Sequence, residues 1–269
     1  MLRLIHEAQN IMNTTIRTFV LLMAVTVLAG CQLWGNSRGN VPIPKELVER
    51  MAAIGSSPAE PMMIRVYKET SELEVWKRTR SGEYALLKTY PICKWSGTLG
   101  PKIREGDRQA PEGFYDITPA SLNPNSSNYL AFNVGFPNKF DQALGRTGSY
   151  LMIHGDCKSI GCYAMTDEGI KEIYAMVRDS FRSGAQALQL QLLPFRMNEE
   201  SFTRHASSQH TSFWRNLKIG VDAFDQTKQP PLWDVCGQRY NFNQNILQFA
   251  QLDPNGPCPA TPWSPMAAL

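Results

Sequence analysis

From residue 63 to residue 194 the chain contains short runs in which apolar and polar side chains alternate with the two-residue period of a β-strand. Residues 188–192, Leu-Gln-Leu-Gln-Leu, are the cleanest case, and the run ends at Pro194. A polar turn at residues 69–72 separates two such runs and predicts a hairpin. Many short strands joined by loops predict a mainly β fold, an antiparallel β-sandwich or barrel-like domain. The expected strands are residues 64–67, 73–77, 84–92, 114–117, 130–134, 150–153 and 188–192.

One segment has helical spacing instead. Thr166 is a favourable N-cap, and the two acidic residues after it suit the positive end of a helix. Gly184 is a favourable stop. We interpret the apolar stripe of this helix as core packing. It consists of Ile170, Ile173, Tyr174, Val177 and Phe181.

The N-terminus is organised like a secretory signal. Arg17 precedes an apolar run over residues 19–29, which is too short to span a bilayer. The run ends in Leu-Ala-Gly-Cys at residues 28–31, which resembles the bacterial lipobox, in which the cysteine is lipidated after cleavage. Cys31 is therefore the expected lipidation site, and residues 1–30 are the expected signal peptide. A plain secretory signal or a short anchor is the alternative, and Met12 is a better candidate start than Met1.

The remaining chain divides by composition. Residues 31–61 are rich in Gly, Asn, Pro and Ser, and we expect a lipidated tether there. A catalytic domain is expected over residues 62–194 and a mixed helical extension over residues 195–269. Gln32 follows the lipobox cysteine, which by resemblance to Gram-negative lipoproteins favours the outer membrane. Hydrophobic residues make up 43%, enough for a core, and the scattered net charge of +3 argues against a nucleic-acid partner.

Five cysteines remain if one is lipidated. An oxidising periplasm permits disulfides, and an odd number leaves at least one free thiol. Cys236 with Cys258 is the preferred pair, because both lie in a tail rich in Pro and Gly. Cys93 with Cys157 is the weaker pairing, and connectivity stays open at this point.

The segment that indicates chemistry runs from His154 to Cys162. A predicted strand ends at the histidine, and the cysteine comes shortly before the predicted helix. The positive end of a helix favours a thiolate, and an imidazole can take the thiol proton and later return it to a leaving amine. A bare Cys–His pair is also compatible with a buried thiol and a hydrogen-bonded strand-end histidine.

Longer motifs around this pair resemble the L,D-transpeptidase catalytic domain (YkuD) family. Residues 153–155, Ile-His-Gly, and 159–162, Ser-Ile-Gly-Cys, match the signature of that family. Residues 110–115, Ala-Pro-Glu-Gly-Phe-Tyr, resemble its Thr-Pro-x-Gly-x-Tyr stretch. The resemblance covers about residues 62–194.

Three departures from the common pattern restrict the resemblance to a subgroup of the family. Ile160 stands where the commoner motif has histidine, and the loop between His154 and Cys162 is shorter than usual. The arginine or asparagine that often follows the cysteine and contacts substrate carboxylates is absent. These features resemble a short-loop murein L,D-transpeptidase/amidase subgroup of Gram-negative bacteria, one member of which detaches a lipoprotein from peptidoglycan.

The resemblance implies a mechanism without cofactor or metal. Cys162 would attack a diaminopimelate carbonyl of a peptidoglycan stem peptide and form a thioester. His154, expected within hydrogen-bonding distance, would act as base and then as acid. Ser159, or a backbone carbonyl beside it, would orient the imidazole, and the amides of Gly161 and Cys162 would bind the oxyanion. The acyl group would pass to an amine or to water, and a peptidoglycan-linked lipoprotein is a second expected partner.

Other polar residues have simpler interpretations. The spacing of His154, Asp156, Cys157 and Cys162 fits no standard zinc pattern. A non-catalytic peptidoglycan-binding lipoprotein on the same fold is the alternative from another class, and Ile160 is its best support. Lys102 and Arg104 could bind stem-peptide carboxylates, but solvated positions are expected for both. Solvated or surface positions are also expected for Asp156, His205 and His210.

Overall fold

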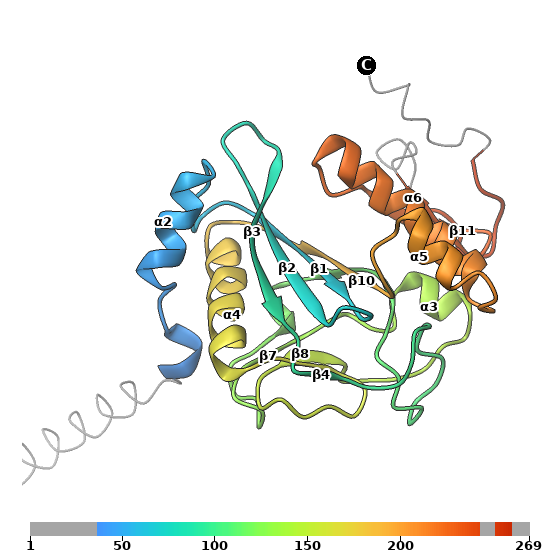
Figure 1. Cartoon of the computed structure of the whole chain (residues 1–269), viewed down its shortest axis with the longest axis horizontal. Helices are drawn as coiled ribbons and strands as arrows, with labels where there is room; N and C mark the ends of the chain where they lie inside the picture. Colours follow the sequence, from blue (N-terminus) through green and yellow to red (C-terminus); the bar gives the residue numbers. More distant parts are fainter. Residues whose placement is uncertain (1–36, 243–250, 260–269) are drawn as a thin grey trace, which may run out of the picture. The chain divides into compact units, whose positions relative to one another are not determined.

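The computed structural model describes residues 37–242 and 251–259 (Figure 1). The chain divides into two compact units, Met1–Asn40 and Val41–Leu269. A short 3-10 helix, η1 (Ser37–Asn40), is the described part of the first unit. The expected signal peptide and Cys31 lie outside the described residues. Within the described ranges, no helix has the length and apolar character needed to cross a bilayer.

The second unit is built on two five-stranded sheets. The first has the strand order β3-β2-β1-β10-β5, in which only the β1–β10 pair is parallel. Its strands are β1 (Met62–Tyr67), β2 (Glu72–Arg78), β3 (Tyr84–Pro91), β5 (Gly113–Ile117) and β10 (Leu188–Leu193).

The second sheet has the order β4-β9-β8-β7-β6, again with one parallel pair, β8–β9. Both sheets are therefore mainly antiparallel, and neither closes into a barrel. The expected mainly β fold is confirmed, and all seven expected strands are present. The strands of the second sheet are β4 (Lys94–Trp95), β6 (Leu122–Asn123), β7 (Ala131–Asn133), β8 (Met152–His154) and β9 (Tyr163–Ala164).

Helix α4 (Asp167–Arg182) contacts both sheets, through β1 of the first and through β7 and β8 of the second. The Thr166 side chain accepts a hydrogen bond from the Gly169 N–H, as expected for an N-cap. Four of the five stripe residues are buried, and Phe181 packs against the same cluster partly buried. The main core lies between this helix and the sheets, and burial of each large apolar side chain there contributes roughly 1.5–3 kcal/mol.

Helix α2 (Lys45–Ala53) corrects the expected tether. Its Leu47 and Met51 are buried in the main core cluster, and Ile43 just before it joins them. Part of the expected tether is therefore a helix packed on the core, ahead of residue 62. The sequence of this short helix looks like a linker, because the residues that bury its apolar side chains, such as Leu87 of β3, lie far along the chain.

The C-terminal extension covers the other face of the first sheet. Because successive strand residues point to opposite faces, Tyr115 joins the main core while Phe114 joins a second cluster. This second cluster includes Trp214 of α6 (Thr211–Thr227) and Phe242 of the β11–β12 hairpin. The remaining elements are α3 (Lys139–Ala143), η2 (Pro119–Ser121), α5 (Glu199–Arg204), β11 (Trp233–Cys236) and β12 (Arg239–Phe242).

Candidate active site

The parallel β8–β9 pair places His154 and Cys162 on one face of the second sheet. Ile153 pairs with Tyr163 and His154 with Ala164, so Cys162, one residue before β9, comes opposite Met152. The Met152 N–H donates to the Cys162 thiol over 3.4 Å, which is consistent with that register. Because side chains alternate along a strand, those of residues 152, 154, 162 and 164 share a face. His154 thus ends β8 and Cys162 immediately precedes β9, the strand that pairs with it.

Two glycines let the backbone take this path. Gly161 has φ +117°, a conformation that side chains disfavour, so glycine immediately before the nucleophile position follows from the turn. At Gly155 the constraint is space, because an added Cβ would lie 2.4 Å from Asp167 Oδ1 and 3.0 Å from the Asn128 carbonyl. The His-Gly and Gly-Cys dipeptides of the motif therefore have separate structural causes.

The Cys162 thiol is partly exposed and is the free cysteine among the described residues. Besides the Met152 contact, it donates toward the Tyr150 carbonyl over 3.8 Å. Burial raises the pKa of Cys162 above its ordinary value, while the Met152 N–H and the charge of Lys102 lower it in part. The thiolate expected from the helix is therefore not favoured at rest. Helix α4 begins only at Asp167, with β9 between it and the thiol.

The His154 imidazole is buried, and its Nδ1 lies 2.6 Å from the Gly155 carbonyl oxygen. A carbonyl only accepts hydrogen bonds, so Nδ1 carries the proton and Nε2 has the free lone pair. Burial lowers the pKa of His154. The hydrogen bond to the Gly155 carbonyl and the charge of Asp156 raise it, but the net shift is downward. The ring is therefore neutral near pH 7 and in the tautomer that a general base needs.

The expected hydrogen bond between His154 and Cys162 is not formed in this arrangement: the thiol contacts Met152 and Tyr150, and His154 contacts Gly155 through Nδ1. Catalytic hydrogen bonds are often long or misaligned before substrate binds. Ser159 does not orient the imidazole, since its hydroxyl donates to the Cys162 carbonyl over 2.6 Å. The backbone carbonyl of Gly155 contacts the imidazole instead.

Ser96, which the sequence did not single out, supports the nucleophile position. Its hydroxyl accepts from the Gly161 N–H and donates to the Arg108 carbonyl over 2.8 Å. The Gly161 amide, an expected oxyanion donor, is therefore already engaged. Ser96 follows β4 directly, and β4 pairs with β9, so this contact depends on a two-residue strand that carries no sequence signal.

Lys102 is a second residue whose position the sequence did not predict. Its side chain is 3% exposed, against the expectation of a solvated charge, and it forms an ion pair with Asp107 over 2.5 Å. The loop folds back on itself, so a partner five residues away covers the ammonium group. Hydrogen bonds from Lys102 and from three backbone N–H groups lower the pKa of Asp107 to about 2 despite its partial burial.

Both expected cysteine pairings are present, Cys236–Cys258 and Cys93–Cys157. The second one joins the segment before β4 to the loop between His154 and Cys162. It therefore holds both the loop that leads to Cys162 and the strand that precedes Ser96.

The remaining candidates lie at the edges of this site or beyond it. Asp156 is exposed and pairs with Lys158, as a solvated loop residue would. His205 is half-buried, because its ring stacks on Phe195 and its Nε2 contacts Glu69 over 2.7 Å. His210 is also half-buried and lines a cavity beside Arg104 and Asp107. Both histidines were expected at the surface, and the structure instead leaves each of them half-buried.

Comparison with known proteins identifies the family of this chain. Residues 61–185 match the family model of the L,D-transpeptidase catalytic domain, YkuD. The Escherichia coli K12 protein named "Putative L,D-transpeptidase YafK" is 44% identical over 222 residues, which cover 82% of this chain and 86% of that protein.

Two solved structures align more distantly. The helical cell shape determining protein Pgp2 from Campylobacter jejuni aligns with a TM-score of 0.39 and 18% identity over 68% of this chain and 66% of its own. L,D-transpeptidase 1 of Mycobacterium tuberculosis aligns with a TM-score of 0.28 and 15% identity over 49% and 61% of the two chains. On the family model and the identity to the E. coli relative, the chain belongs to the L,D-transpeptidase catalytic domain (YkuD) family.

Proposed function

We propose that the protein is a peptidoglycan-modifying cysteine enzyme that forms a thioester with a diaminopimelate-containing stem peptide. The observation that carries this proposal is the shared face of Cys162 and His154, one a free thiol and the other a neutral imidazole held by the Gly155 carbonyl. Membership of the L,D-transpeptidase family supports the choice of a peptidoglycan stem peptide as substrate.

The proposed chemistry starts from two neutral groups. His154 Nε2 takes the thiol proton as Cys162 Sγ bonds to the carbonyl carbon, and the imidazolium then protonates the amine as the C–N bond breaks. An incoming amine or water next attacks the thioester, His154 takes its proton, and the thiol is regenerated. An amine gives L,D-transpeptidation; water gives an amidase that detaches a lipoprotein from peptidoglycan.

The oxyanion contact is assigned to the Cys162 amide, since Ser96 engages the Gly161 N–H. The peptide units on either side of the Gly161–Cys162 bond are both held, one by Ser96 and the other by Ser159 at the Cys162 carbonyl. An N–H donor that is already held in place needs little free energy to reorganise when negative charge develops on the oxygen in the transition state.

We place the enzyme at the periplasmic face of a Gram-negative outer membrane, anchored through a lipid on Cys31 and acting in cell wall biogenesis and cell shape. The signal-like N-terminus and the lipobox resemblance support this placement. Mass spectrometry of the membrane-extracted protein tests it: a diacylated Cys31 at the N-terminus is expected, and an unmodified cysteine there contradicts it.

The catalytic proposal is tested with purified protein and the stem tetrapeptide L-Ala–γ-D-Glu–meso-diaminopimelate–D-Ala. Intact-protein mass spectrometry should show an acyl adduct on wild type and none on Cys162→Ala, with His154→Gln forming it far more slowly. The muropeptide products then separate the two outcomes, because new cross-links mean transfer and freed stems or released lipoprotein peptide mean hydrolysis.

The competing hypothesis is a non-catalytic peptidoglycan-binding lipoprotein. The exposed Ile160, in place of the usual histidine, is the feature that favours it. It requires that Cys162→Ala, folded as judged by circular dichroism, restores the phenotype of a deletion strain as well as wild type does.

A further inference from the structure

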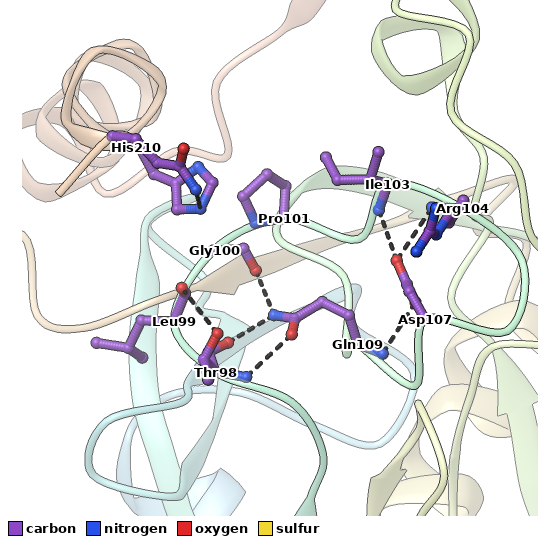
Figure 2. Close-up of a pocket in the computed structure, with 10 residues that line it drawn as sticks. Thr98, Leu99, Gly100, Pro101, Ile103, Arg104, Asp107, Gln109 and His210 are labelled. Atoms are coloured by element: carbon purple, nitrogen blue, oxygen red, sulfur yellow. Dashed lines mark hydrogen bonds between the residues drawn. The ribbon is translucent and has the colours of Figure 1, made fainter.

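A cavity of about 370 Å³ lies between the loop of residues 98–109 and the start of the C-terminal extension (Figure 2). This volume is at the small end of the range for ligand sites. In Figure 2 the His210 ring stands at one end of the lining and Arg104 at the other, beside Asp107. Gln209 and His210 come from the extension, so the catalytic domain alone does not complete this cavity.

The loop wall of the cavity is fastened by its own side chains. Gln109 Nε2 donates to the carbonyls of Thr98 and Gly100, and its Oε1 accepts from the Thr98 N–H. The Asp107 carboxylate accepts from the backbone N–H groups of Ile103, Arg104 and Gln109. A wall with these bonds is formed before a ligand arrives, which lowers the entropic cost of binding.

A fully buried ion pair fastens the same loop to the extension. Lys68 and Glu112 lie 3.0 Å apart with no exposed side-chain surface. Lys68 donates to loop carbonyls, including that of Gly100 over 2.9 Å, while Glu112 accepts from the Gly100 N–H and from Trp214 Nε1 of α6. The two walls of the cavity are thus tied together beneath it.

One residue of the cavity lining also approaches the turn that precedes Cys162. The carbonyl of Gln109 lies 3.9 Å from where a Cβ at Gly161 would be, and Gly161 precedes Cys162. Ser96 bonds both Gly161 and Arg108, so one loop supports the nucleophile and lines the cavity.

The charges in the cavity favour an anion. The Asp107 carboxylate is satisfied by Lys102 and by the three backbone N–H groups. Arg104 is exposed, lines the cavity and forms no ion pair with any described residue. A guanidinium presents paired donors that match a carboxylate.

We propose that this cavity is a subsite, completed by the C-terminal extension, that binds the α-carboxylate of the peptide unit joined to the carbonyl that Cys162 attacks. Arg104 is the residue that recognises the carboxylate, and His210 and Gln109 bound the space beside it. This inference rests on the proposed function, because it assigns the substrate group on the amine side of the scissile bond.

The test compares the tetrapeptide L-Ala–γ-D-Glu–meso-diaminopimelate–D-Ala with its C-terminal amide, which lacks only the terminal charge. For wild type, kcat/KM of thioester formation should be about tenfold higher with the free acid, the effect of one charge-assisted hydrogen bond. Arg104→Gln should remove this preference, and Arg104→Lys should restore part of it. Arg80→Gln is the control, since Arg80 is exposed in the β2–β3 turn and does not line the cavity.

Calorimetry on Cys162→Ala separates this inference from the proposed function. If no thioester forms with wild type, the proposed chemistry fails, while tighter binding of the acid than of the amide still supports the subsite. Equal affinity for the two peptides, no binding of either, or a preference that survives Arg104→Gln overturns the inference. Melting temperatures of the variants confirm that the exposed substitutions leave the fold intact.

Discussion

The N–H of Gly161 donates to the hydroxyl of Ser96, and through it the residue before the nucleophile is joined to the Arg108 carbonyl. Gly161 and Ser96 are 65 positions apart, and the β4–β9 pairing brings them together. The contact sets the position of the Cys162 backbone without involving the thiol.

Ser96→Ala should lower the rate of thioester formation roughly fivefold, because loss of a hydrogen bond of about 1 kcal/mol loosens the Gly161–Cys162 backbone. Single-turnover kinetics followed by mass spectrometry measure the rate. Ser81→Ala, whose hydroxyl pairs with Thr79 in the exposed β2–β3 turn, is the control and should react at the wild-type rate. A faster Ser96→Ala variant would instead identify the freed Gly161 amide as the oxyanion donor.

The activity should have a broad pH plateau. His154 must be neutral to accept a proton, and burial lowers its pKa below 6.5, the ordinary value for histidine. The loss of kcat/KM on the acid side should therefore occur at a pH below 6.5. The thiol pKa is raised by burial, so thiolate should accumulate only above pH 9, its ordinary value. The rate of Cys162 alkylation by iodoacetamide should still be rising at pH 9. A rate that is constant between pH 7 and pH 9 would show a preformed thiolate–imidazolium pair and refute this assignment.

Gly161→Ala should destabilise the fold and reduce activity. A side chain at φ +117° costs about 1 kcal/mol or more, and the strain lies next to the nucleophile. Gly184→Ala is a matched control, because Gly184 has φ +104°, no atom within 4 Å of an added Cβ, and a position after α4 away from the site. Thermal unfolding should report similar losses for both variants, whereas only Gly161→Ala should lower kcat. Equal kcat values would mean that the nucleophile tolerates the backbone change.

Removal of the Cys93–Cys157 disulfide should affect both stability and activity. The double serine variant opens a loop of 64 residues, which corresponds to about 4 kcal/mol in the chain-entropy model, and it releases the loop that carries Cys162. The Cys236/Cys258 double serine variant opens a loop of 22 residues in the extension and should lose stability alone. Denaturant unfolding and kcat on both variants check this, and an equal loss of activity in the two would be inconsistent with it.

The local sequence pattern was sufficient to predict much of the secondary structure. The seven expected strands and helix α4 with its Thr166 cap all appear, because period and capping depend on residues close together in the chain. The strands it missed, such as β4 and β9, have two residues each and cannot show a period. Helix α2 was assigned to a tether because its burial depends on partners in distant strands.

The candidate site divides in the same way. The sequence by itself determined the candidate pair His154 and Cys162 and the glycines beside them, since the proposed base, the proposed nucleophile and the turn lie within one short segment. Only the tertiary structure decided that Ser96 holds Gly161, that Lys102 is buried, and that the extension closes a cavity over the 98–109 loop. These contacts join residues whose separation in the chain carries no periodic signal. They form only when the two sheets and the loops between them pack together, because packing brings polar groups from distant segments within hydrogen-bonding distance.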